Sequence, residues 1–184
     1  PNIPPQMPAM GIAVDNDKPA PNVLIDMDDA AVRAGMGEIG FCGMLLTPEF
    51  GPRQRLQAII TDAPLEADPI LQEPVCTGCK EHATYCPMGA INADSTRTLN
   101  ICGKEMVVAD IDHSICKTCK NGACPSMFYA GGPADRSAAI CTRSCIQFLE
   151  ESGRIKNTFH NPFRQRPAWG IVSKETRLNT SAQK

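Results

Sequence analysis

Apolar positions along the chain form short runs that are broken by glycine and proline, which favours a loop-rich α+β protein over one built from long elements. Residues 28–36 (DDAAVRAGM) predict a short helix that Asp28 or Asp29 caps. Two further apolar runs, at 44–47 and 56–61, are separated by a turn and predict two strands. The second run is β-branched, so we expect it to be buried on both faces.

The second half of the chain contains one predicted strand and the clearest predicted helix. The strand covers residues 105–112 (EMVVADID), and the helix covers 134–152 and ends at Gly153. One side of this helix collects apolar residues and two cysteines: Ile140, Cys141, Cys145, Phe148 and Leu149. Residues 1–28 predict an extended N-terminal arm, and residues 154–184 predict a basic, irregular C-terminal strap.

The high cysteine content adds a second source of stability to this picture. The chain has 184 residues, 10 cysteines and only 5% aromatic residues, so we expect metal ligation or partner contact to add to a modest core. The formal net charge of −2 gives no argument for nucleic-acid binding. No apolar run approaches the ~18 residues of a membrane span. We therefore expect a cytoplasmic protein; the start at Pro1 leaves open a removed export leader or a fragment.

The first cysteine motif has the spacing of an iron–sulfur site. Cys76, Cys79 and Cys86 follow the ferredoxin run C-x2-C-x2-C-x3-C-P, with His82 in the place of its third cysteine. Such a loop wraps thiolates around one cluster, while the cysteine before proline points to a second cluster. We expect a helix to begin after that Cys-Pro pair.

The second motif repeats this chemistry downstream. It consists of Cys102, Cys116, Cys119 and Cys124, the last again followed by proline. Exchange of the last ligand predicts two [4Fe–4S] clusters. The first would take Cys76, Cys79 and Cys124, and the second would take Cys86, Cys102, Cys116 and Cys119.

The fourth ligand of the first cluster has three candidate solutions. His82 binds iron through a ring nitrogen, Cys141 or Cys145 reaches in from the later helix, or three cysteines hold a [3Fe–4S] cluster. The competing hypotheses are that a zinc site uses the C-x2-C pairs, and that Cys141 and Cys145 serve the core. We expect Cys42 to be a small buried residue.

Residues 31–91 carry a family resemblance. The stretch AVRAGMGEIGFCGMLLTPEFGPRQRLQAIITDAPLEADPI, followed by CTGC and CPMGAI, resembles the reductive dehalogenases and their relatives, the epoxyqueuosine reductases. The resemblance implies the C-terminal part of a corrinoid reductase. It assigns a reductase-core segment to 29–72 and a ferredoxin-like two-cluster module to 73–133. We expect the helix predicted from the apolar pattern, 134–153, to pack on that module.

The resemblance also implies a cobalamin shared with a missing domain or a partner. Residues implied near the corrinoid are Gly37, Glu38, Gly40, Thr47, Glu49, Gly51 and Arg53; the alternative is that the glycines only form tight turns. Three departures matter: the family's larger N-terminal half is absent, His82 replaces a cysteine, and four residues rather than three separate Cys119 from Cys124.

These observations predict a module that relays single electrons to a reductase domain or subunit holding the substrate cofactor, fed by a donor such as ferredoxin or flavodoxin. Reductive dehalogenation and epoxide reduction are the two implied reactions, and catalysis by this chain alone is not expected. The alternatives are an iron–sulfur subunit of an unrelated redox complex without corrinoid, and a metal-stabilised interaction scaffold.

Overall fold

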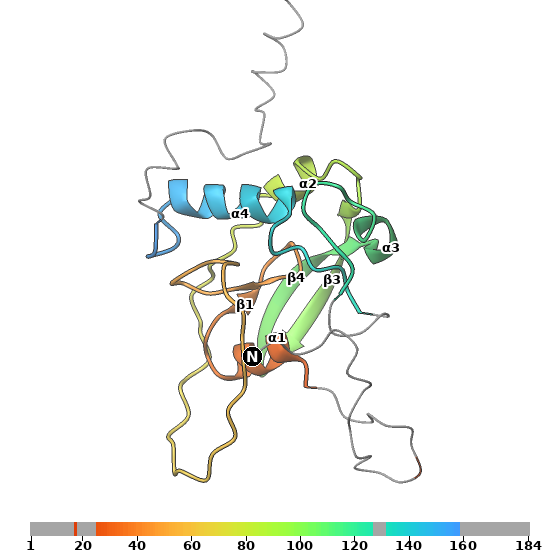
Figure 1. Ribbon diagram of the computed structural model, residues 1–184. Helices are drawn as coiled ribbons and strands as arrows, with labels where there is room; N and C mark the ends of the chain where they lie inside the picture. The colour runs from red at the N-terminus through yellow and green to blue at the C-terminus, as the bar shows by residue number, and fades with distance from the viewer. Residues whose placement is uncertain (1–16, 18–24, 127–131, 159–184) are drawn as a thin grey trace, which may run out of the picture.

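A computed structural model describes Asp17 and residues 25–126 and 132–158 of the chain. Most of the predicted N-terminal arm and C-terminal strap therefore lies outside the described residues. Figure 1 shows a central hairpin, with α1 at the end that carries its turn and α2, α3 and α4 at the opposite end. This arrangement of short helices and antiparallel strands confirms the α+β class.

Helix α1 spans Met27–Arg33 and confirms the first predicted helix. Its cap is Asp26 rather than Asp28 or Asp29: the Asp26 carboxylate accepts from the backbone N–H groups of Asp28 at 3.0 Å and Asp29 at 3.2 Å. The chain leaves the helix through Gly35 at φ +71°, where a Cβ atom would lie 2.2 Å from the Pro69 carbonyl oxygen. Glycine is therefore required at this position.

Strands β1 (Glu38–Ile39) and β2 (Leu45–Leu46) form a small antiparallel pair, with Glu38 opposite Leu46. All four residues are buried. The close approach of the strands explains Gly37, because a Cβ atom there would lie 2.2 Å from the Leu46 carbonyl oxygen. The predicted strand at 44–47 is thus confirmed in a short form.

The central hairpin consists of β3 (Ile91–Ile101) and β4 (Lys104–Ile111) in antiparallel register, with an irregularity between Asn92 and Thr96. Strand β4 confirms the predicted strand at 105–112. The expected helix after Cys86-Pro87 is wrong, because the chain turns there and enters β3 instead.

Three helices lie at the end of the hairpin away from its turn (Figure 1). They are α2 (Glu81–Thr84), α3 (His113–Cys116) and α4 (Ile140–Glu151). Helix α4 begins six residues later than the predicted helix at 134–152, and Gly153 at φ +66° follows its end. No helix in the described ranges is long and apolar enough to cross a bilayer.

The predicted strand at 56–61 is wrong. Residues 53–62 form neither strand nor helix, and the side chains of Ile59 and Ile60 are 89% and 96% exposed. Figure 1 shows this segment as part of a long excursion away from the body. Without a neighbouring strand, β-branched residues have no ladder of hydrogen bonds to join.

The buried residues form three apolar clusters that position the cysteines. One surrounds Phe41 and includes Cys116 and Cys141, and a second joins α1 to the hairpin through Val32 and Val108. The third joins β2 to α4 through Leu46, Cys145 and Leu149. Cysteines therefore lie inside the cores that attach α4, whereas the second cluster contains none.

Candidate metal centre

The ten cysteines are all free thiols, but they differ in environment. Cys102 and Cys124 are exposed, while the other eight are buried or half-buried. Those eight form two groups of four, which we call the first and second thiol groups. The first thiol group comprises Cys42, Cys76, Cys79 and Cys145; the second comprises Cys86, Cys116, Cys119 and Cys141.

The first thiol group is defined by interactions that converge on Cys145. A hydrogen bond to Cys42, burial, and the charges of Cys42, Cys76 and Cys79 all raise the pKa of Cys145. The same hydrogen bond lowers the pKa of Cys42, so Cys145 is the donor of this buried pair. Residues from three distant segments, β1–β2, the C-x2-C loop and α4, thus bring four thiols together.

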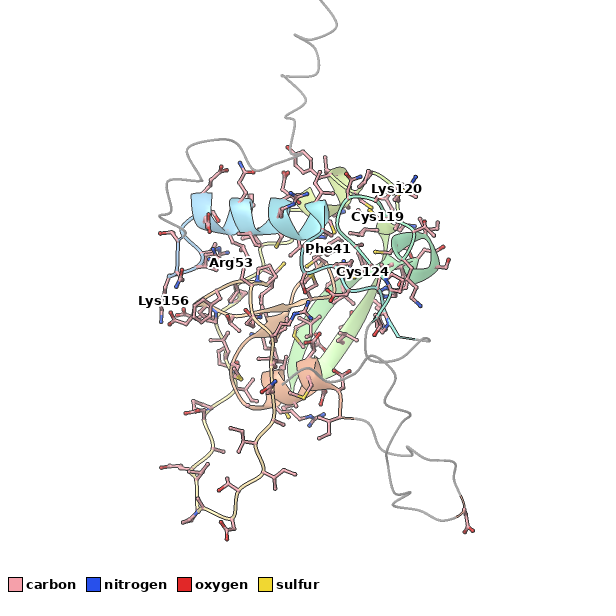
Figure 2. The ribbon with its side chains drawn as sticks, in the orientation of Figure 1. Phe41, Arg53, Cys119, Lys120, Cys124 and Lys156 are labelled. Carbon is pink, nitrogen blue, oxygen red and sulfur yellow. The ribbon has the colours of Figure 1, made fainter. Side chains whose placement is uncertain are left out.

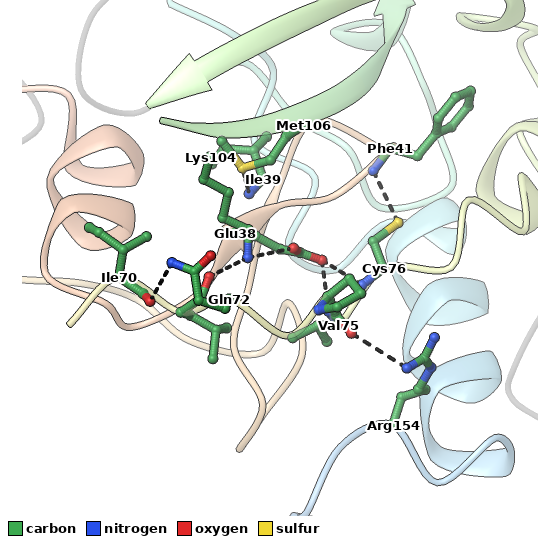
Figure 3. A network of polar contacts seen from close by, with 12 residues as sticks. Glu38, Ile39, Phe41, Ile70, Gln72, Val75, Cys76, Lys104, Met106 and Arg154 are labelled. Atoms are coloured by element: carbon green, nitrogen blue, oxygen red, sulfur yellow. Dashed lines mark hydrogen bonds and ion pairs between the residues drawn. The ribbon is translucent and has the colours of Figure 1, made fainter. Parts of the chain in front are cut away.

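Cys76 is held in place by a buried polar network (Figure 3). One carboxylate oxygen of Glu38 accepts from the backbone N–H groups of Val75 at 2.8 Å and Cys76 at 2.6 Å. The other oxygen lies 3.0 Å from Nζ of Lys104, and both side chains are buried. The Phe41 N–H donates to the Cys76 sulfur at 3.3 Å, and the Gly78 N–H does so at 3.4 Å.

The second thiol group lines a small apolar cavity. Its four cysteines face this space together with Ala90, Ile91 and Ala139. Burial raises the pKa of Cys116, and the neighbouring thiols of Cys141, Cys119 and Cys86 raise it further. Backbone N–H groups point at two of the sulfurs: Ala90 donates to Cys86 at 3.3 Å, and Asn121 donates to Cys119 at 3.4 Å.

His82 lies inside α2 with only 2% of its surface exposed. Neither ring nitrogen has a hydrogen-bond partner among the described residues. Burial, followed by the charge of Arg136, lowers the pKa of His82 to about 4, so the imidazole is neutral. Its ring centroid lies 5.5 Å from that of Phe41. Buried polar atoms are normally satisfied, so these two nitrogens are an exception in the described part of the chain.

Cys102 does not lie near the cysteines that were predicted to share its cluster. Cys102 occupies the turn between β3 and β4, where Nη1 of Arg33 lies 3.2 Å from its sulfur. Ile91, at the other end of the hairpin, lines the cavity of the second thiol group. Along β4, seven residue steps separate Lys104, beside the turn, from Ile111, which pairs with Ile91, and this spans about 23 Å at ~3.3 Å per residue. The fold therefore places Cys102 at the opposite end of the hairpin from the cavity that Cys86, Cys116 and Cys119 line.

The predicted ligand Cys124 is also exposed. Its backbone forms a two-hydrogen-bond bridge with Asp135, at 2.9 and 2.8 Å. In the described part of the chain, no contact joins its sulfur to Cys76 or Cys79. Figure 2 shows Cys119 and Cys124 on the side of the molecule near the N-terminal end of α4.

Four of the residues implied near a corrinoid lie by the C-terminal end of α4 or the segment after it: Thr47, Glu49, Gly51 and Arg53. Arg53 lies 2.6 Å from a Glu150 carboxylate oxygen, and Lys156 lies 2.6 Å from Glu49 (Figure 2). Gly51 pairs with Thr47 in a short bridge, and a Cβ atom at Gly51 would lie 3.1 Å from Leu149 and 3.6 Å from Ile155. At Gly40, a Cβ atom would lie 2.5 Å from a Leu46 methyl carbon. These contacts supply a packing role for each residue.

No three His, Cys, Asp or Glu side chains in residues 25–126 and 132–158 lie close enough together to hold one metal ion. Four thiolates around a single zinc ion would lie about 3.8 Å apart, given a Zn–S distance of ~2.3 Å and tetrahedral geometry. In an iron–sulfur cluster each thiolate binds a different iron. The four sulfurs must then be farther apart than around one ion.

Sequence reasoning missed two members of this centre. Cys42 precedes Cys76 by 34 residues and belongs to no cysteine motif, and only its Gly-rich surroundings distinguish it. Arg136 is 5% exposed and lies close to both thiol groups, since its Nη2 donates to the Cys42 carbonyl oxygen at 2.7 Å. No local pattern in the sequence identifies it as a buried cation.

Comparison with known proteins gives three informative relatives. The chain is 32% identical over 121 residues to a tetrachloroethene reductive dehalogenase of Desulfitobacterium hafniense, covering 64% of this chain and 22% of the relative. It is 42% identical over 64 residues to that of Sulfurospirillum multivorans, covering 33% and 13%. It is 33% identical over 79 residues to an epoxyqueuosine reductase of Listeria monocytogenes, covering 42% and 21%. No family model and no solved structure matches the chain.

Proposed function

Since this chain is a relative of the reductive dehalogenases and epoxyqueuosine reductases, we propose that it is the iron–sulfur part of a reductase of that kind. The chain spans only 22% of the length of the first reductive dehalogenase it matches. The substrate and the substrate-reducing cofactor therefore belong, in this proposal, to a larger protein or a partner. The observation that carries the proposal is the presence of two separate groups of four thiols.

We assign one [4Fe–4S] cluster to each thiol group. The first would be held by Cys42, Cys76, Cys79 and Cys145, and the second by Cys86, Cys116, Cys119 and Cys141. This assignment keeps five of the ligands expected from the motifs. It replaces the exposed Cys102 and Cys124 with the buried Cys141 and with Cys42 and Cys145.

The donor set and its surroundings suit such clusters. Iron–sulfur clusters are held by cysteine thiolates, and their potentials depend on hydrogen bonds to sulfur and on solvent exposure. Backbone N–H groups already point at the sulfurs of Cys76, Cys86 and Cys119. Apolar residues pack against both groups. When bound, the clusters would supply one-electron transfer, while the chain fixes the thiolates and excludes solvent.

The proposed reductase also requires a cobalamin and an electron donor. By resemblance to corrinoid reductases, a cobalamin would be held mainly outside this chain, and a ferredoxin or flavodoxin would supply electrons. Dehalogenation and epoxide reduction are both compatible with this scheme.

One observation favours a second candidate, an iron–sulfur subunit without corrinoid. Arg53, Glu49 and Gly51 are engaged in contacts that fasten α4 and the segment after it. A cobalamin spectrum in protein purified anaerobically from its native source would support the corrinoid reductase. Iron without cobalamin in the native complex would support the second candidate.

The proposed ligands are tested by anaerobic reconstitution of the full chain with iron and sulfide. Two cubane clusters predict roughly eight irons per chain. We expect Cys42→Ser and Cys141→Ser each to lose about half of this iron, because each removes a ligand from a different thiol group. The matched controls Cys102→Ser and Cys124→Ser should keep it all.

Two outcomes would contradict the proposal. Wild-type protein without iron would reject the iron–sulfur function. Iron loss from Cys102→Ser, with none from Cys141→Ser, would reject the assignment of the second thiol group and restore the ligand set expected from the motif.

A further inference from the structure

Arg136 is a cation buried between the two thiol groups, just before α4. Only 5% of its surface is exposed, and it is the one Lys or Arg among the fully buried residues of the described ranges. Its Nη2 donates to the Cys42 carbonyl oxygen at 2.7 Å, and its own carbonyl oxygen accepts from the Thr142 hydroxyl at 2.6 Å. Both the side chain and the backbone of Arg136 are therefore held by hydrogen bonds.

No carboxylate of the described residues lies at ion-pair distance from this guanidinium; Asp28 interacts with it only at longer range. Arginine stays protonated in proteins, and burying an unpaired charge is costly. Among the described residues no acidic side chain forms an ion pair with Arg136, and its buried Nη1 has no hydrogen-bond partner. By contrast, Lys104 is paired with Glu38 and Arg53 with Glu150.

The side chains that feel the charge of Arg136 include thiols of both groups, besides His82, His113 and Asp28. Burial raises the pKa of Cys116 and Cys141, and the charge of Arg136 draws both values back down. A hydrogen bond from Cys145 lowers the pKa of Cys42, and the Arg136 charge adds to this effect. A neutral thiol cannot offset a buried cation, but a thiolate can.

We propose that Arg136 is the counter-charge shared by the two thiolate-bound clusters and that it raises their reduction potentials. The inference rests on the proposed function, because the missing negative charge is that of the clusters. Reduction adds one electron to an already anionic cluster, and a nearby fixed cation stabilises the more negative state. Arg136 is thus a tuning residue rather than a ligand.

The test is an EPR-monitored redox titration of the anaerobically reconstituted full chain. We expect Arg136→Gln to lower the potential of at least one cluster so that its reduced-to-oxidised ratio at a fixed potential falls about tenfold, which is 59 mV for one electron. Arg136→Lys should stay within about threefold of wild type, since it keeps the charge. The matched control is Arg55→Gln, which removes a positive charge from an exposed side chain paired with Asp135.

The outcomes separate the inference from the proposed function. Iron-free wild type would reject the function itself. Full iron loading of Arg136→Gln with an unchanged potential would overturn the inference alone. If Arg136→Gln keeps its circular dichroism but loses iron, retention of iron by Arg136→Lys supports the counter-charge. Equal loss from the Lys variant would overturn it, because shape rather than charge would then be required.

Discussion

Replacing Glu38 with glutamine tests how the first thiol group is held. Glu38 and Lys104 form an ion pair at 3.0 Å, and their side chains are only 5% and 9% exposed. The same carboxylate accepts the N–H groups of Val75 and Cys76. The glutamine amide oxygen can still accept both bonds, so the substitution removes mainly the charge.

The expected cost follows from the burial of this pair. Removing one partner from a buried ion pair costs about 3–5 kcal/mol, because the other charge is left uncompensated. Lys104 keeps one hydrogen bond, to the Leu71 carbonyl oxygen at 2.6 Å. We therefore expect Glu38→Gln to lower the free energy of unfolding by about 3 kcal/mol, at the lower end of that range.

Urea unfolding of the reduced, iron-free chain measures this change, and a double-mutant cycle isolates the pair. Lys104→Met alone should also destabilise the protein. The double variant should be more stable than the sum of the two single effects predicts, by about 2 kcal/mol, because it leaves no unpaired charge. Glu49→Gln is the control, since its ion pair with Lys156 is at least half exposed and should contribute at most about 1 kcal/mol.

Two results would refute this reasoning. A loss below about 1 kcal/mol for Glu38→Gln would mean that the pair is effectively solvated. Additive single effects in the double variant would mean that Glu38 and Lys104 do not interact in solution, and that the Cys76 segment is held by its hydrogen bonds alone.

Four further changes probe the rest of the molecule. Leu149→Ala opens a cavity where α4 packs on β2 and should cost about 2–5 kcal/mol in urea unfolding. Arg53→Met removes a half-buried ion pair with Glu150 and should cost about 1–3 kcal/mol by the same assay. Ile60→Asp, at a 96% exposed position, should change stability by less than about 0.5 kcal/mol. Because the proposed ligands are all cysteines, His82→Ala and His82→Cys should both leave the EPR spectrum of loaded protein unchanged.

The elements that sequence predicts well are those whose apolar pattern matches their burial. In β4, the apolar run from Met106 to Ala109 coincides with three buried positions, although Val107 is 52% exposed. Its partner β3 is mostly polar between Ile91 and Ile101, because much of it faces solvent. The pattern at 56–61 is apolar although the segment is exposed. An apolar pattern indicates the intrinsic β propensity of a segment, but it does not indicate whether a partner strand is present.

The residues of the candidate site also differ in how far the sequence predicts them. Local spacing identifies Cys76, Cys79, Cys116 and Cys119, because a C-x2-C loop is a contiguous unit. Cys102 and Cys124 have suitable spacing, but the turn of the hairpin and the bridge to Asp135 leave them exposed. Long-range packing decides which thiols meet, and no motif encodes it.

Helix α4 shows how the two thiol groups are tied to each other. Cys141 and Cys145 are four residues apart on one helix, so their Cβ atoms lie about 5–6 Å apart. Cys141 belongs to the second thiol group and Cys145 to the first. One rigid turn of helix therefore sets the separation of the groups, whatever the loops around them do. In the proposed relay, this places the two clusters side by side. Arg136 lies between them and is held there by its hydrogen bonds with Cys42 and Thr142.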